Sequence, residues 1–118
     1  MSKQTLMLRL LFWAALLFAV TMALLPQPPH TPADQFGDKF EHMLAFSTMA
    51  ALAAAAYPRL PLFRIGERLS FLGAMIEVVQ SIPELHRDCD VRDWAADTLA
   101  ITVVLLIAGL FRLRWRRR

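Results

Sequence analysis

Residues 6–25 form an almost uninterrupted apolar run, and this run restricts the possible folds more than any other feature of the sequence. Arg9 is its only charged residue. A helix rises about 1.5 Å per residue, so a helix of this length covers the roughly 30 Å of a bilayer's hydrocarbon core. A cleaved signal peptide after Lys3 is the alternative, but the run is long and no A-x-A cleavage site follows it. The run therefore predicts a first transmembrane helix.

The whole chain has the composition of a membrane protein. Of its 118 residues, 57% are hydrophobic, and its mean hydropathy of +0.43 is higher than is usual for a soluble domain. Further apolar segments, bounded by prolines and polar residues, predict three more helices at residues 38–57, 62–82 and 94–113. The predicted fold class is all-α: a single domain that forms a four-helix transmembrane bundle.

Lysine and arginine residues predict the orientation of this bundle. They gather near the amino terminus, around residues 59–68 and in a basic tail at residues 112–118. Because positive charge favours the cytoplasmic side, we expect both termini in the cytoplasm and a multi-pass protein of the bacterial inner membrane. A basic tail can also contact nucleic acid, but directly after an apolar helix it favours anionic lipid headgroups. Membrane lipids are therefore the expected partners, and nucleic acid is not.

Small residues predict how the second helix packs. They recur every fourth residue at Ser47, Ala51 and Ala55, beside Ala50 and Ala54. Stripes of this kind let membrane helices approach closely. The first helix has few polar residues beyond Arg9 and Thr21, so we expect it to contribute only apolar contacts.

Polar residues lie near the outer ends of the three later helices, at helical spacing. The pairs are Asp38 and His42, Glu77 and Gln80, and Asp93 and Asp97. Residues three or four apart share a helix face, and a charged group in hydrocarbon costs about 3 kcal/mol, so such groups usually face the bundle interior. We therefore predict one contiguous binding site, made of Asp38, Lys39, His42, Glu77, Gln80, Arg87, Asp93 and Asp97.

These residues also resemble a known family. The pattern Asp38-Lys39-x-x-His42-x-x-x-Phe46, followed by Glu77-x-x-Gln80, Arg87 and Asp93-x-x-x-Asp97, is similar to that of the VanZ-like membrane proteins. The family is named after a member associated with teicoplanin resistance, so the resemblance implies a small multi-helix membrane domain linked to glycopeptide antibiotic resistance. The family usually has asparagine where this chain has Asp97, and glycine where it has Ala100. The first departure argues against a role that needs a neutral amide at position 97. The second argues against a close helix approach at the turn of Ala100.

Three kinds of function fit such a site. In the first, it binds or senses a cell-envelope component, such as a lipid-linked or peptide headgroup that enters from the outer leaflet. In the second, Lys39 and Arg87 neutralise the carboxylates, and the network only stabilises a membrane scaffold. In the third, the protein is a membrane-embedded enzyme acting on a lipid-linked envelope substrate. His42 is then a general base oriented by Asp38, with Glu77 as proton donor.

Two observations weigh against particular chemistries. No serine or cysteine nucleophile stands beside His42 in the sequence, which disfavours covalent catalysis. The single cysteine, Cys89, excludes an intramolecular disulfide and any multi-cysteine metal site. A metal site from His42 and the carboxylates is chemically conceivable, but Lys39 and Arg87 compete for the same groups. We therefore expect no metal and no cofactor.

Overall fold

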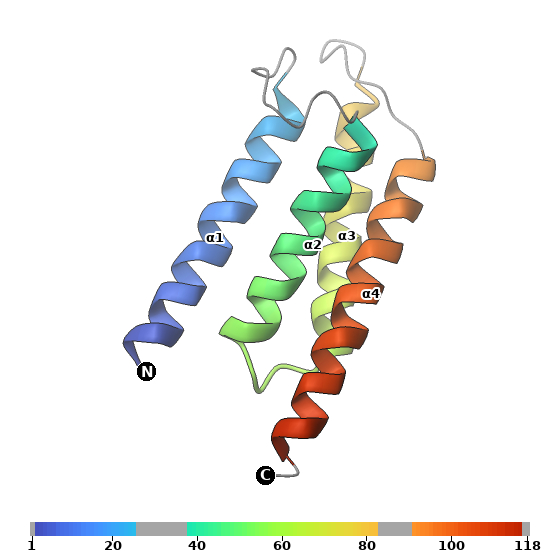
Figure 1. Ribbon diagram of the computed structural model, residues 1–118. Helices are drawn as coiled ribbons and strands as arrows, with labels where there is room; N and C mark the ends of the chain where they lie inside the picture. Colours follow the sequence, from blue (N-terminus) through green and yellow to red (C-terminus); the bar gives the residue numbers. More distant parts are fainter. Residues whose placement is uncertain (1, 26–37, 83–90, 117–118) are drawn as a thin grey trace.

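The computed structural model describes residues 2–25, 38–82 and 91–116, and every regular element in these ranges is an α-helix (Figure 1). The helices are α1 (Lys3–Leu24), α2 (Asp38–Ala56), α3 (Leu62–Gln80) and α4 (Val91–Arg116). The all-α prediction is therefore confirmed. Helix α1 begins earlier than predicted because Ser2 caps it, its hydroxyl accepting a hydrogen bond from the Thr5 backbone N–H at 3.0 Å.

Some residues singled out in the sequence fall outside this description. Arg87, Cys89 and the proline-rich residues 26–32 lie between the described ranges. The side chains of Asp38 and Lys39 are not described either, although their backbones are helical.

Two of the four helices are long and apolar enough to cross a membrane. These are α1, over Lys3–Leu24, and α4, over Val91–Arg114. Helix α2 contains a shorter apolar stretch, Phe40–Ala56. Helix α3 carries four charged residues, which are Arg64, Glu67, Arg68 and Glu77. Length and composition thus support two of the four predicted crossings directly.

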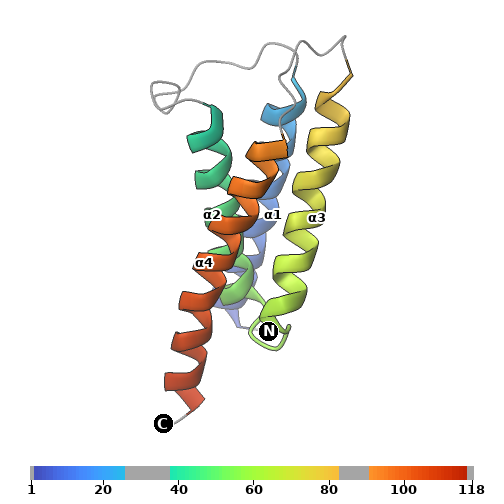
Figure 2. The same cartoon turned by 90° about the vertical axis from the view of Figure 1, so that its right-hand side faces the viewer.

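The helices form a bundle in which α2 and α4 pack against each other in the middle, α1 lies on α2, and α3 lies on α4. Figures 1 and 2 show that the beginnings of α2 and α4 lie at one end of the bundle with the ends of α1 and α3. We call this the polar end. The beginnings of α1 and α3 and the ends of α2 and α4 lie at the opposite end, which we call the arginine end.

The buried face of α2 differs from the predicted stripe. Ala51 and Ala55 are exposed, while a set of residues at spacings of three and four is buried: Phe46, Met49, Ala50, Ala53, Ala54 and Ala56. The reason is that α2 packs against both α1 and α4, so its buried surface is a broad face with the usual helical period. Of the residues named in the sequence, Ala50 and Ala54 belong to it.

Helix α3 buries polar residues and exposes aromatic ones. Phe63 and Phe71 are 78% and 66% exposed, whereas Glu77 and Gln80 are 7% and 2% exposed. Helices α1 and α4 also expose large apolar side chains, among them Leu10, Leu17, Phe18, Leu106, Leu110 and Phe111. A helix on the surface of a soluble bundle, in contrast, directs an apolar stripe to the core and a mainly polar face to water.

Two arginines from other helices complete the carboxyl end of α2. The Arg9 Nε of α1 donates to the Ala56 carbonyl at 3.1 Å. The Arg112 guanidinium of α4 donates to three carbonyls, those of Leu60, Ala54 and Tyr57, at 2.9, 3.1 and 3.2 Å. The last carbonyls of a helix lack partners within it and carry partial negative charge, so cations are favourable there. Arg112, predicted as part of a lipid-facing tail, instead ties α4 to α2.

Candidate functional site

The buried polar side chains of the described residues come from α3 and α4. They are Glu77 and Gln80, near the end of α3, and Asp97, in the second turn of α4. Because α3 ends and α4 begins at the polar end, all three lie in the same part of the bundle. We call His42, Glu77, Gln80, Asp93 and Asp97 the polar cluster.

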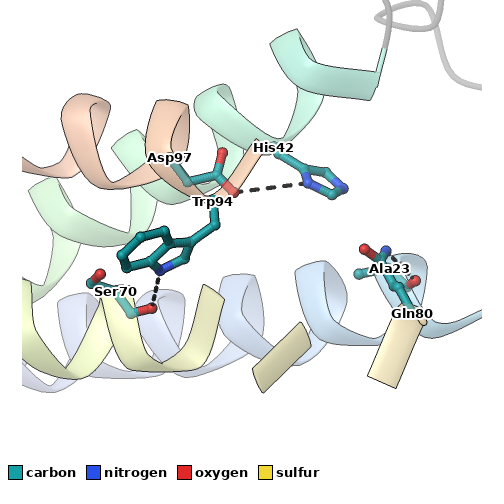
Figure 3. Close-up of polar contacts among 6 residues, drawn as sticks. All are labelled: Ala23, His42, Ser70, Gln80, Trp94 and Asp97. Carbon is teal, nitrogen blue, oxygen red and sulfur yellow. Dashed lines mark hydrogen bonds and ion pairs between the residues drawn. The ribbon is translucent and has the colours of Figure 1, made fainter. Parts of the chain in front are cut away.

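Asp97 faces a histidine from α2. Its Oδ2 lies 3.8 Å from the Nδ1 of His42, and the two side chains point toward each other (Figure 3). This distance allows an ion pair when His42 is protonated but is too long for a hydrogen bond. The other carboxylate oxygen of Asp97, Oδ1, is buried and accepts no hydrogen bond from the described residues.

Gln80 connects the polar cluster to α1. Its Nε2 donates to the Ala23 carbonyl at 2.8 Å (Figure 3). Ala23 lies in the last turn of α1, where carbonyls have no partner within the helix. The expectation that α1 gives only apolar contacts is therefore wrong. The Gln80 side-chain oxygen, Oε1, is buried and, like Asp97 Oδ1, finds no donor within the described part of the chain.

Two more carboxylates surround Asp97. Glu77 and Asp93 lie close enough for their negative charges to act on it. Glu77 is buried and Asp93 is partly buried. Both engage in polar interactions of their own. The polar cluster is therefore rich in hydrogen-bond acceptors and in negative charge.

The structure brings together residues from all three later helices of the predicted site, with one difference in pairing. From the sequence, His42 was expected beside Asp38 on the same helix, with Lys39 and Arg87 as the cations that neutralise the carboxylates, Asp97 among them. The described partner of Asp97 is His42. The side chains of Asp38 and Lys39, and all of Arg87, lie outside the described residues.

A second polar contact, which sequence reasoning missed, joins α3 and α4 deeper in the bundle. The Ser70 and Thr98 hydroxyls are 2.9 Å apart. Figure 3 shows the neighbouring contact, in which Trp94 Nε1 donates to the Ser70 carbonyl at 3.0 Å. Trp94, near the beginning of α4, therefore points inward to α3. A sequence signal existed, because Ser70, Glu77 and Gln80 follow one another at spacings of seven and three and share a helix face.

The described residues contain no group of three or more His, Cys, Asp or Glu side chains arranged to hold a metal ion. What they do contain is the polar cluster, in which the carboxylates of Glu77, Asp93 and Asp97 and the Gln80 side-chain oxygen can all accept hydrogen bonds. A group that fits it carries N–H or O–H donors, with or without positive charge.

No protein-family model, curated protein or solved structure matches the chain. The resemblance to the VanZ-like proteins therefore stays a prediction from the sequence pattern. The function has to be argued from the geometry of the polar cluster.

Proposed function

We propose that the protein is a four-span membrane protein whose polar end binds a polar group of a cell-envelope component. The membrane location is supported by the exposed apolar side chains of α1 and α4 and by the exposed phenylalanines of α3. Only a small part of either candidate span is buried in the bundle, unlike the core helix of a soluble protein. Two hydrogen bonds join α1 to the rest of the bundle, from Arg9 to the Ala56 carbonyl and from Gln80 to the Ala23 carbonyl. They favour a retained helix over a cleaved signal peptide.

The orientation follows from the positive-inside rule. The arginine end carries Arg59, Arg64 and Arg68 in or beside the connection of α2 and α3, and Arg112 and Arg114 near the end of α4. This end belongs in the cytoplasm, with both termini. The polar end then faces the outside of the inner membrane, where lipid-linked and peptide components of the envelope are found.

The topology has a direct test in Cys89, the single cysteine of the chain. A thiol reagent that cannot cross membranes should modify Cys89 in intact spheroplasts. A Cys89→Ser variant with a cysteine introduced at Gln27 controls for steric protection. Reaction of both proteins only after lysis contradicts the proposed orientation.

The observation that carries the binding function is the pair of buried acceptors, Asp97 Oδ1 and Gln80 Oε1, to which no described residue donates. Each such buried group costs about 1–3 kcal/mol unless something donates to it. A donor-bearing ligand, such as an amino, amide or hydroxyl group of an envelope headgroup or peptide, removes this cost on binding. The VanZ-like resemblance, with its link to glycopeptide resistance, agrees with a ligand of this origin.

The two competing functions fit less well. A network kept only for stability is expected to satisfy its own buried acceptors. The enzyme alternative uses His42 as a general base oriented by Asp38, but the side chain of Asp38 lies outside the described residues. The carboxylate described beside His42 is that of Asp97, at 3.8 Å, which is longer than a hydrogen bond. Turnover of a lipid-linked substrate by the purified protein distinguishes an enzyme from a binding protein.

Ligand-dependent stabilisation tests the proposal. A cell-wall pentapeptide with a free amino group should raise the unfolding temperature of the detergent-purified protein, since a ligand of the folded state stabilises it. Its N-acetylated form should raise the temperature less. Asp97→Leu should abolish the effect, while Thr102→Val, which changes an exposed hydroxyl in the same helix, should keep it. An equal shift in wild type and Asp97→Leu contradicts binding at the polar cluster.

A further inference from the structure

A groove of about 870 Å³ lies between α1 and α3. It exists because α1 packs mainly on α2 and α3 packs mainly on α4, while α1 and α3 contact each other little. Its lining includes Ala53 and Tyr57 of α2. The volume falls in the range of about 300–1,000 Å³ that is typical of ligand sites. The groove begins at the arginine end, far from the polar cluster, and takes no part in the function proposed above.

The lining of the groove changes in character along its length. Away from the arginine end it is apolar, with Leu16, Leu72 and Met75. At the arginine end it includes Arg9, Arg59 and Arg68.

Two of the three arginines are free to meet a ligand. Arg9 is held by the Ala56 carbonyl and lies over the Tyr57 ring, 4.4 Å from its centroid. Arg59 and Arg68 are exposed, and neither forms an ion pair with another described residue. A groove with an apolar length and a cationic mouth is complementary to an amphiphile with an anionic head.

The length of the groove matches one leaflet. Its lining on α1 runs from Thr5 to Leu16, about 16 Å at 1.5 Å per residue. Half of the hydrocarbon core is about 15 Å. With the arginine end in the cytoplasm, the groove spans the inner leaflet, and its cationic mouth lies at headgroup level.

We propose that this groove holds an anionic phospholipid of the cytoplasmic leaflet, with an acyl chain between α1 and α3 and the phosphate at Arg59 and Arg68. The inference rests on the membrane location proposed above, but it is independent of any ligand at the polar end. Each basic residue near a membrane surface favours an anionic lipid by about fivefold. A preference of roughly five- to twentyfold over a zwitterionic lipid is therefore expected.

Trp13 reports on the groove because it is part of the lining, where its Nε1 donates to the Tyr57 hydroxyl at 2.9 Å. The full chain is reconstituted in phosphatidylcholine vesicles that contain dibrominated phosphatidylglycerol or dibrominated phosphatidylcholine. Bromine quenches nearby tryptophan fluorescence, and the part of the quenching lost in Trp13→Phe belongs to the groove. Brominated phosphatidylglycerol should quench Trp13 at roughly five- to twentyfold lower mole fraction.

A matched pair of variants separates the groove from general surface charge. The double variant Arg59→Ala and Arg68→Ala should reduce the preference to about twofold or less. The double variant Arg64→Ala and Arg114→Ala loses the same charge from exposed arginines outside the groove, and it should keep the preference. Circular dichroism verifies that both remain helical.

Several outcomes overturn the inference. Equal quenching by the two lipids, an unchanged preference in the Arg59 and Arg68 variant, or an equal loss in the control variant each does so. A Trp13 quenched by neither lipid also overturns it, because no acyl chain then reaches the groove. If the protein does not float with vesicles, the membrane location fails as well, whereas floating without preference overturns the lipid site alone.

Discussion

The two ends of the bundle differ in whether their polar groups have hydrogen-bond partners among the described residues. At the arginine end, Arg9 and Arg112 donate to carbonyls at the end of α2 and in the following turn. At the polar end, Asp97 Oδ1 and Gln80 Oε1 are buried without a donor from the described residues. The first arrangement locks α1, α2 and α4 together. The second leaves two buried acceptors to which a ligand can donate hydrogen bonds. We therefore propose that the arginine end stabilises the fold and that the polar end binds the ligand.

The largest effect on stability is expected at the arginine end. Arg112→Ala removes the donor of three carbonyl hydrogen bonds, and a hydrogen bond to a charged group contributes about 1.5–3 kcal/mol. We expect a loss of about 3–5 kcal/mol in the free energy of unfolding, measured by denaturant titration in detergent micelles. Arg114→Ala, at an exposed position two residues further along α4, should change it by less than about 0.5 kcal/mol. Similar losses in both variants contradict the role of Arg112.

A smaller loss is expected for Glu77→Ala, because Glu77 belongs to the polar end but has polar interactions there. Loss of the interactions of this buried carboxylate should cost about 2–3 kcal/mol. Glu67→Ala, at an exposed position of α3, should cost far less. Function should follow the same order in any envelope phenotype, with protein levels measured to separate misfolding from loss of the site. Equal effects of the two variants count against a site that includes Glu77.

In contrast to the two variants above, Asp97→Asn should increase the free energy of unfolding. The substitution keeps the side-chain shape and removes a negative charge that lies near those of Glu77 and Asp93. We therefore expect a gain of about 1 kcal/mol in the free energy of unfolding, together with weaker binding of a cationic ligand. Thermal unfolding with and without the pentapeptide measures both quantities. A loss above about 2 kcal/mol would show that Asp97 holds the bundle together as Arg112 does.

The smallest change is expected for Gln80→Leu. It removes the hydrogen bond to the Ala23 carbonyl, but it also removes the unsatisfied Oε1. The two contributions oppose each other, so the free energy of unfolding should change by less than about 1 kcal/mol. A parallel Ser70→Ala variant, which breaks the contact with Thr98, should cost about 1 kcal/mol without affecting ligand binding. A loss of several kcal/mol in Gln80→Leu alone contradicts the contrast between the two ends.

Much of the fold could be predicted from the sequence because local signals determine it. Apolar runs and prolines such as Pro61 predicted the helices, and the predicted bounds differ from the observed ones by at most a few residues at each end. The buried face of α2 was mispredicted at Ala51 and Ala55, because it depends on which helices pack around α2. No sequence window contains that information.

The site could be predicted in part for the same reason. Spacing placed Glu77 and Gln80 on one face of α3, and burial of both agrees with it. The pairing of His42 with Asp97, the bond from Gln80 to Ala23 and the inward turn of Trp94 each join different helices. Such contacts depend on the rotation and height of one helix relative to another, which single-sequence periodicity does not determine.

The central claim is that the unsatisfied acceptors of the polar end are completed by a ligand. An experimental structure of the protein, purified from native membranes with its lipids, tests this most directly. The account predicts density for a bound group with donors about 3 Å from Asp97 Oδ1 and Gln80 Oε1, next to His42. A structure in which Lys39 or Arg87 donates to both oxygens, with no further density, contradicts it and makes the polar end a stabilising network like the arginine end.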